Sequence, residues 1–221
     1  MNKIHLLYQP DGNRRYAKNK KIPLREAYEK SVDKIISLIE WFFDYEEAHE
    51  LSIHALDRYN LQRPLVEINA LKRAIESGIH RICASEVVNN KGLEIRLIGR
   101  PSDVFLDENA QKEIQKKLKR RESTDKRLNI LVSYDASEEL QNATAQCEKE
   151  GLPLTFENLS IRWSISPVSF VLRTSQLPNS TRISAYFPAI EQARLISTQT
   201  PPQELTKEEF QKIMDKYYNL K

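Results

Sequence analysis

The sequence predicts an α/β fold in which a central, mostly parallel sheet is covered by helices. Short apolar runs of strand length alternate with longer amphipathic stretches, which is typical of strand–helix–strand units. Hydrophobic residues make up 40% of the chain and recur along its whole length, which excludes global disorder. A length of 221 residues suits one domain, so we expect a single domain over residues 1–221.

The first half of the chain predicts two strands and three helices. A short apolar run is closed by a Pro-Asp-Gly turn, and apolar residues then recur at three- and four-residue spacing, as on the buried face of a helix. Pro64 suits the first turn of a helix. The predicted elements are a strand over 4–9, helices over 14–18 and 24–45, a strand over 50–56 and a helix over 64–88.

The second half continues the alternation and ends in a helix. Thr206 with Glu209 three residues later is a capping signal for that terminal helix. The basic run over 116–121 most simply marks the exposed face and cationic last turn of a helix, with contact to nucleic acid as the alternative. The other predicted elements are strands over 93–99, 128–134 and 169–175 and helices over 107–121 and 136–149.

Composition excludes several classes of protein. A net charge of +3, evenly spread, does not indicate a nucleic-acid partner. Cys83 and Cys147 lie far apart without a CxxC motif, which argues against a zinc site or disulfide framework and favours a reduced, cytoplasmic chain. We expect no signal peptide and no integral membrane segment. The five glycines form neither a GxGxxG motif nor a P-loop.

The segment after the first predicted strand has the chemistry of an anion site. In Asp11-Gly12-Asn13-Arg14-Arg15, a turn glycine opens a helix beside two guanidinium groups. Free amides, the positive end of a helix dipole and arginine side chains all favour a phosphate. A carboxylate beside a bound phosphate is repelled by it unless a divalent cation lies between the two groups. Asp11 is therefore most simply interpreted as a magnesium ligand. Taken alone, the segment also allows a helix-capping Asp11 with solvated arginines.

Two further predicted strand ends are polar and cationic. Ligands of open α/β sheets bind beyond the carboxyl ends of the strands, so we expect these side chains to converge with Asp11. Each arginine alone is more simply structural. Together they would form two adjacent diphosphate sites, one metal-assisted and one purely cationic, as the coupling of two isoprenyl diphosphates requires. The residues are Asn60 and Arg63 after the second strand and Arg173, Arg182 and Ser184 at or after the last.

A diphosphate site for isoprenyl substrates also needs an apolar channel. The long helix over 24–45 carries Trp41, Phe42 and Phe43, which could line such a hydrophobic channel. Packing in the core is the simpler role for most of them.

Taken together, these segments resemble the cis-prenyltransferases, the undecaprenyl diphosphate synthase family. PDGNRRYA at 10–17 is similar to the DGN-x-R-aromatic-Ala motif of that family, and four later blocks follow in the family's order. Doubled arginine and Tyr-Phe-Pro at 186–188 look most like the subgroup that makes irregular, branched products such as cyclolavandulyl diphosphate. The later blocks are NLQRP at 60–64, LEIRLIG at 93–99, LNILVSY at 128–134, and Arg173-Thr174 with Arg182-Ile183-Ser184.

The resemblance implies a role for each candidate residue. Asp11 would hold Mg²⁺ on an allylic diphosphate, gripped by the amides of Gly12 to Arg15 and by the side chains of Arg15 and Arg63. Asn13 and Asn60 would position the reacting partners. The second diphosphate would be held by Arg173, Arg182 and Ser184. Arg14 would be a further cation near the first site. The family has an Arg/His pair after its DGN motif, and Lys21 and Arg25 would take the place of that pair here.

The sequence also departs from the family pattern. An acidic residue that completes the family's metal shell aligns with Arg194, so only one protein ligand for Mg²⁺ is expected. The tryptophan of the family's NWxRP is Leu61, its Gly-Gly-Arg is Asp135-Ala136-Ser137, and its arginine-rich tail is missing. Ordinary long-chain polyprenyl synthesis is therefore not expected.

The resulting hypothesis is a homodimeric transferase that couples short isoprenyl diphosphates, by irregular, branched or short-chain coupling, with release of diphosphate. One alternative is a terpene synthase that ionises and cyclises a single prenyl diphosphate on the same fold. Another is a catalytically silent subunit of a prenyltransferase complex, which Arg194 and the missing tail would favour.

Overall fold

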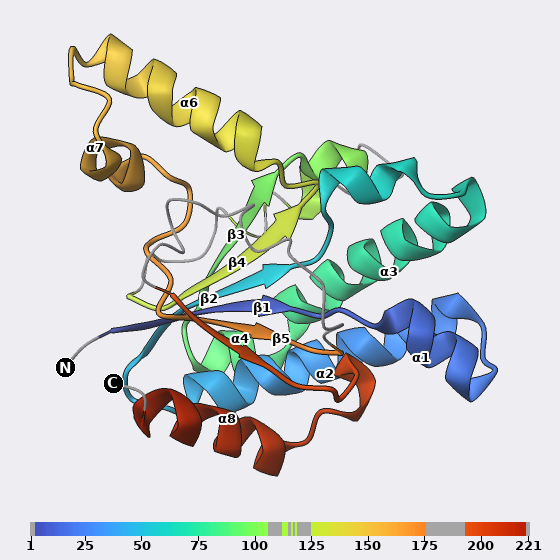
Figure 1. Ribbon diagram of the computed structural model, residues 1–221. Coiled ribbons are helices and arrows are strands. Elements are labelled where there is room, and N and C mark those ends of the chain that lie inside the picture. Colours follow the sequence, from blue (N-terminus) through green and yellow to red (C-terminus); the bar gives the residue numbers. More distant parts are fainter. Residues whose placement is uncertain are drawn as a thin grey trace.

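The computed structural model describes residues 3–105, 112–114, 116, 118, 125–175 and 193–219. Its centre is a six-stranded sheet in the order β3-β4-β2-β1-β5-β6, and every neighbouring pair is parallel (Figure 1). The predicted parallel α/β fold is thus confirmed. The strands are β1 (Ile4–Gln9), β2 (Ala48–His54), β3 (Glu94–Gly99), β4 (Arg127–Val132), β5 (Phe170–Arg173) and β6 (Arg194–Ser197).

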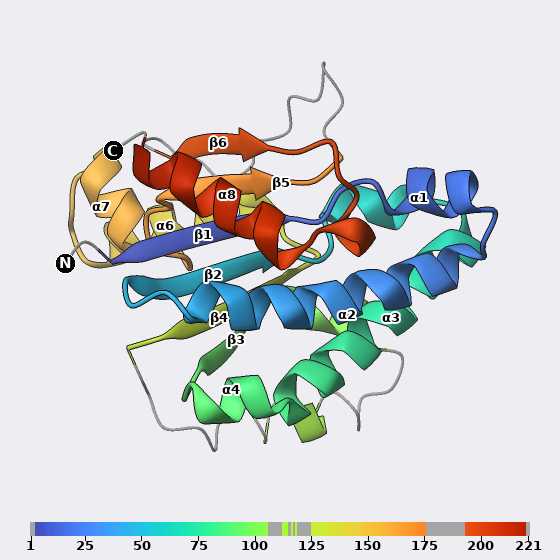
Figure 2. The ribbon, with the colours of Figure 1, turned by 90° about the horizontal axis from the view of Figure 1, so that it is seen from below.

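Helices cover both faces of this sheet. Figure 2 shows α2, α3, α4 and α8 on one face, whereas α6 and α7 lie on the other, and α1 extends beyond the carboxyl ends of the strands. The helices are α1 (Asn13–Lys20), α2 (Leu24–Phe43), α3 (Leu65–Ala84), α4 (Glu86–Asn90), α6 (Ala136–Lys149), α7 (Phe156–Ile161) and α8 (Lys207–Asn219), with 3₁₀ helices at Arg58–Gln62, Pro101–Asp103 and Pro202–Glu204.

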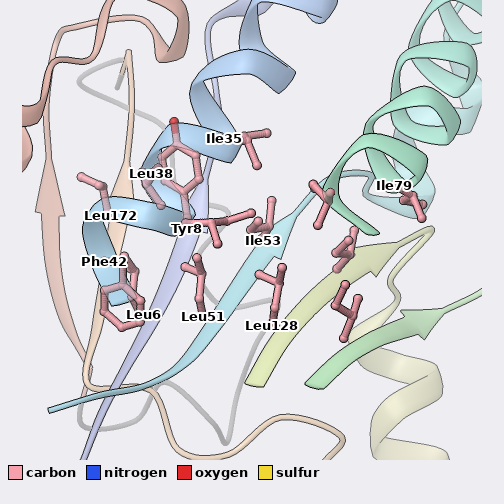
Figure 3. Packing of buried hydrophobic residues seen from close by; sticks show 14 of the residues in the cluster. Leu6, Tyr8, Ile35, Leu38, Phe42, Leu51, Ile53, Ile79, Leu128 and Leu172 are labelled. Atoms are coloured by element: carbon pink, nitrogen blue, oxygen red, sulfur yellow. The ribbon is translucent and has the colours of Figure 1, made fainter. Parts of the chain in front are cut away.

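Alternation along each strand divides the core between the two faces. In β1, Leu6 and Tyr8 pack toward α2 and α3, and Leu7 packs into a second cluster that includes Trp163 on the opposite face. Figure 3 shows the larger cluster, in which Leu38 and Phe42 of α2 meet the strands. These buried side chains hold α2 and α3 against the sheet, and they position the loops at its carboxyl edge.

The predicted helix over 64–88 is divided in two. Ser85 adopts an extended conformation and its hydroxyl accepts the amide of Val88, so α3 ends and α4 begins there. Sequence reasoning missed α7 and β6. The predicted helix over 107–121 lies mostly outside the described residues. In the described part of the chain, no helix is both long enough and apolar enough to cross a membrane.

Candidate functional site

The ends of β1 and β5 lie side by side at the carboxyl edge of the sheet. Gln9 pairs with Arg173 in the register of the two parallel strands, so the segments that follow β1 and β5 begin next to each other. Tertiary hydrogen bonds join them: the hydroxyl of Thr174 donates to the carbonyl oxygen of Asp11 at 3.0 Å. The two predicted strand ends therefore converge.

Gly12 allows this close approach. Its φ is +103°, and a Cβ there would overlap the side chain of Ser175 on the neighbouring segment. Both features require glycine. Gly12 is also the N-cap of α1, with no side chain capping the first amides and no acidic residue in the first turn. The amino end of α1 is thus open to an anion.

Asp11 is surrounded by guanidinium groups. One carboxylate oxygen accepts from Arg173 at 2.8 Å, and the other accepts the amide of Gly12 at 2.6 Å and lies 3.8 Å from the guanidinium of Arg15. Arg15 also donates to the carbonyl oxygen of Ser175, which holds its side chain across the turn. The carboxylate keeps 41% of its surface exposed, whereas Arg173 is largely buried. Asp11, Arg15 and Arg173 thus share one cluster that remains accessible to a ligand.

A second cluster joins α1 to the start of α3. Arg63 donates to the side-chain oxygen of Asn60 at 2.6 Å and to the hydroxyl of Tyr28 at 3.3 Å. Its guanidinium lies 3.3 Å from the carboxylate of Glu67, which is also 3.5 Å from Arg14. Burial raises the pKa of Tyr28, so its hydroxyl stays protonated. Sequence reasoning missed Tyr28 and Glu67, although Glu67 lies four residues after Arg63, the spacing of a helical ion pair.

Asn13 is held by a residue from the far end of the chain. Its amide nitrogen donates to the carbonyl oxygen of Pro10 at 2.9 Å, and its oxygen accepts from Gln203 at 2.6 Å. The same nitrogen of the buried Gln203 donates to the carbonyl oxygen of Ala27 at 2.9 Å. Gln203 therefore fixes Asn13 against α2, and no local motif in the sequence indicates it.

An apolar pocket begins at Asn13 and Pro10 and runs between α2 and α3. Its empty space is about 570 Å³, including the part open to solvent. Gly78 of α3 faces Val32 of α2, and a Cβ at Gly78 would lie 3.1 Å from a Val32 methyl group. The pocket is lined mostly by aliphatic side chains, among them Ile35, Leu71, Ile75 and Ile79.

The aromatic residues considered for the channel do not line this pocket. Phe42 and Phe43 are fully buried in the core, where their rings meet edge to face at 5.1 Å. Trp41 packs against Phe210 of α8. The simpler interpretation, core packing, is correct for the two phenylalanines, and the channel is aliphatic because α2 turns its aliphatic face toward α3.

The remaining predicted residues are not brought to Asp11. Lys21 ends α1 at its far end, and Arg25 pairs with Glu29 at 2.8 Å on the surface of α2. Arg194 begins β6 beside Phe170, whereas Ser197 is the residue level with Arg173. Within one chain Arg194 therefore lies at the amino end of its strand and does not replace a ligand beside Asp11. Arg182 and Ser184 lie outside the described residues.

The residues present fit a magnesium ion only together with a substrate. Among the described residues no group of three or more His, Cys, Asp or Glu side chains could enclose a metal. Mg²⁺ is commonly held by one or two carboxylates, with substrate phosphates and water completing its shell. The half-exposed carboxylate of Asp11 beside the open end of α1 meets that requirement as a single protein ligand.

Comparison with known proteins identifies the family of the chain. The model of a prenyltransferase family described as undecaprenyl diphosphate synthase matches residues 10–221. A tritrans,polycis-undecaprenyl-diphosphate synthase (geranylgeranyl-diphosphate specific) of Pyrobaculum aerophilum is 33% identical over 95 residues, which span 43% of this chain and only 40% of that protein.

Two longer matches span nearly the whole chain. An isoprenyl transferase of Campylobacter jejuni is 26% identical over 223 residues, covering 99% of this chain and 97% of the relative. The crystal structure of lavandulyl diphosphate synthase from Lavandula x intermedia, in complex with dimethylallyl diphosphate, superposes with a TM-score of 0.78 at 18% identity, covering 96% of this chain and 94% of that one. At this identity the structural match establishes the shared fold.

Proposed function

This chain belongs to the undecaprenyl diphosphate synthase family of prenyltransferases, and from that membership we propose that it transfers the prenyl group of one short isoprenyl diphosphate to a second one. The observation that carries the proposal is the cluster of Asp11, Arg15 and Arg173 at the open amino end of α1. An apolar pocket starts at the neighbouring Asn13. A site with a cationic head and an aliphatic pocket matches a ligand that is a diphosphate at one end and a hydrocarbon at the other.

The reaction needs charge stabilisation more than acid–base chemistry. The allylic C–O bond breaks with its electron pair on the leaving diphosphate, the alkene of the second substrate forms the new C–C bond, and a proton leaves the product cation. The α1 amides and Arg15 bind the leaving group as its charge grows. Bound Mg²⁺, with Asp11 as its protein ligand, would neutralise part of that charge.

The other candidate residues orient the partners and exclude water. Arg173 holds the Asp11 carboxylate in place at 2.8 Å, and Gln203 holds Asn13 at the mouth of the pocket. Asn60 keeps Arg63 directed toward Tyr28, another residue of the pocket lining. The aliphatic walls shield a carbocation from water. In our proposal Arg182 and Ser184 complete the second diphosphate site with Arg173.

We further propose that the coupling is irregular, joining two allylic substrates to a branched product, in a homodimer. The doubled arginine of PDGNRR supports this finer assignment.

Product analysis tests the proposal. Purified protein is incubated with dimethylallyl, geranyl or farnesyl diphosphate, with and without isopentenyl diphosphate and Mg²⁺, and products are identified by mass spectrometry. A product with twice the carbon count of one allylic substrate, unaffected by isopentenyl diphosphate, is expected. An unchanged carbon count would instead indicate cyclisation, and no turnover in any combination would indicate a silent subunit.

The pocket assignment has its own test. Gly78→Leu places a side chain between α2 and α3, so farnesyl diphosphate should lose more activity than dimethylallyl diphosphate. Equal losses for both substrates would contradict the placement of the hydrocarbon in this pocket.

A further inference from the structure

One end of the molecule combines exposed apolar side chains with a cationic helix. Leu65 and Val66, in the first turn of α3, are 77% and 85% exposed, and Tyr59 in the preceding 3₁₀ helix is also exposed. Exposed aliphatic side chains in adjacent positions contribute nothing to the core and are typical of interaction surfaces. We refer to Leu65, Val66 and the neighbouring residues 13–25 as the α1–α3 surface.

The charge of this surface is strongly positive. Residues 13–25 contain six Lys or Arg residues and no Asp or Glu. Arg14 lies 3.5 Å from Glu67, so this stretch is in contact with the first turns of α3, and Figures 1 and 2 show both at the same end of the molecule. Lys18 and Lys21 are exposed, and neither has an ion-pair partner among the described residues.

Some of this charge is neutralised within the protein. Four carboxylates pair with the stretch, so two net positive charges remain on it. The pairs are Asp11 with Arg15, Glu29 with Arg25, Glu67 with Arg14, and Glu204 with Lys20.

A second exposed apolar surface has the opposite charge. Leu154, Phe156 and Ile161 in and before α7 are exposed, with Ile161 at 72%. Residues 135–162, which include α6 and α7, contain six Asp or Glu residues and only two Lys or Arg. The two surfaces thus present similar apolar side chains in opposite electrostatic surroundings, and this difference indicates what each can bind.

We propose that the α1–α3 surface docks on an anionic lipid bilayer. A peripheral lipid-binding surface combines aliphatic side chains that enter the headgroup region with cations that contact anionic headgroups, and both are present here. The acidic surface around α7 would be repelled by the same bilayer. Docking would bring the mouth of the pocket, at Pro10 and Asn13, to the membrane surface.

Vesicle co-sedimentation tests the proposal without measuring turnover, so its outcome is independent of the transferase assignment. The probes are vesicles of phosphatidylcholine alone and of equal parts phosphatidylcholine and phosphatidylglycerol. The protein should sediment with the anionic vesicles and not with the neutral ones, and added salt should release it because the attraction acts within a Debye length of about 10 Å at 0.1 M.

Surface variants then identify the docking face. Leu65→Gln with Val66→Gln should weaken vesicle binding by roughly tenfold or more, because two aliphatic side chains no longer leave water. Lys18→Glu should weaken it by roughly fivefold or more, since each cation near an anionic surface contributes about that factor. The matched control, Ile161→Gln, removes an equally exposed aliphatic residue from the acidic surface and should change nothing. Thermal melts should show that all variants fold.

Several outcomes would overturn the proposal. These are equal binding to neutral and anionic vesicles, unchanged binding by the double variant, or an equal loss with Ile161→Gln. Conversion of a dimer to a monomer by the double variant would assign the surface to a second copy of the chain instead.

Discussion

The amino-terminal and carboxyl-terminal halves of the central strands both carry polar clusters, and the two clusters differ in exposure. In the amino-terminal half, Glu50 of β2 has no exposed surface and is enclosed by Asn129, Ser52 and Ser166. At the carboxyl edge, Asp11 keeps 41% of its surface open to solvent. A buried polar group that protein donors satisfy is part of the structure, whereas a half-exposed carboxylate among guanidinium groups can still accept a ligand.

The largest expected effect is on activity at the carboxyl edge. Asp11→Ala should abolish measurable prenyl transfer, a loss of about 10³-fold or more, because in the proposed mechanism Asp11 is the protein ligand of the Mg²⁺ that neutralises the leaving diphosphate. The free energy of unfolding should fall by about 1 to 3 kcal/mol, because the largely buried guanidinium of Arg173 loses the carboxylate that accepts its hydrogen bond. Diphosphate release and urea denaturation measure the two quantities.

Asp33→Ala is the matched control for Asp11→Ala. It removes a carboxylate that pairs with Arg81 on the exposed side of α2, and it should leave turnover unchanged. Full activity of Asp11→Ala would rule out Asp11 as the metal ligand.

The next largest effect is on stability in the amino-terminal half. Burial opposes ionisation of Glu50, but hydrogen bonds from Ser166 and Asn129 favour its charged form, and its pKa is lowered overall. Glu50→Ala removes the acceptor of these donors and should reduce the free energy of unfolding by about 3 kcal/mol. Activity per folded molecule should not change. The measurement is urea denaturation beside a turnover assay at low temperature.

Asp125→Ala provides the control, because its carboxylate is exposed in a surface pair with Lys3 at 3.7 Å. It should cost less than about 1 kcal/mol. If Glu50→Ala and Asp125→Ala had the same free energy of unfolding, the buried cluster around Glu50 would contribute no more to stability than a surface pair. The contrast between a structural cluster around Glu50 and a ligand-binding cluster around Asp11 would then be wrong.

Gln203 is buried like Glu50 but donates to Asn13 near the carboxyl edge, and its substitution should have a smaller effect on activity than Asp11→Ala. Gln203→Met keeps the volume but removes the donor to Asn13 and Ala27, so Asn13 loses its fixed orientation. We expect kcat to fall about tenfold with KM nearly unchanged, because misplacement of a positioning group acts on the reacting geometry. Gln211→Met, on the exposed side of α8, should leave steady-state kinetics unchanged. Equal kinetics for both variants would show that Gln203 is only structural.

The smallest expected effect is a change in pH dependence. Burial lowers the pKa of His5, which donates to the carbonyl oxygen of Ser166 and accepts from Ser52 as a neutral ring. The unfolded chain binds a proton near pH 6.5 and the folded chain does not, so stability is lost as the pH falls below that value.

His5→Gln should therefore reduce the slope of unfolding free energy against pH below 6.5, by up to about 1.4 kcal/mol per pH unit. Part of the slope should remain, because burial also lowers the pKa of His49 and His54. Urea denaturation at a series of pH values measures this slope. An identical slope in both proteins would mean that His5 titrates alike in the folded and unfolded chain.

Local patterns were sufficient to predict five of the six strands of the sheet and the first cluster. The turn at Gly12 and the alternating apolar strands are short-range features, and the rule that parallel strands present their carboxyl ends together placed Arg173 near Asp11. Helix α7 was missed although Thr155 caps it, and β6 was missed because its four residues include exposed and charged positions.

Other parts of the site depend on tertiary structure that no local pattern encodes. Strand register puts Arg194 beside Phe170, at the amino end of β6, and this position cannot be read from a local motif. Gln203 meets Asn13 across 190 positions of sequence. Such contacts become visible only when the packing of the C-terminal segment against α2 is known.

The dependence of Asn13 on Gln203 has a consequence for the order of events during synthesis. The ribosome releases Asn13 190 residues before Gln203, so a nascent chain can pair its first strands while Asn13 still lacks the partner that orients it. On the proposed function, a chain that has not yet released Gln203 would have a poorly oriented Asn13 and would react more slowly with prenyl diphosphates than the folded protein.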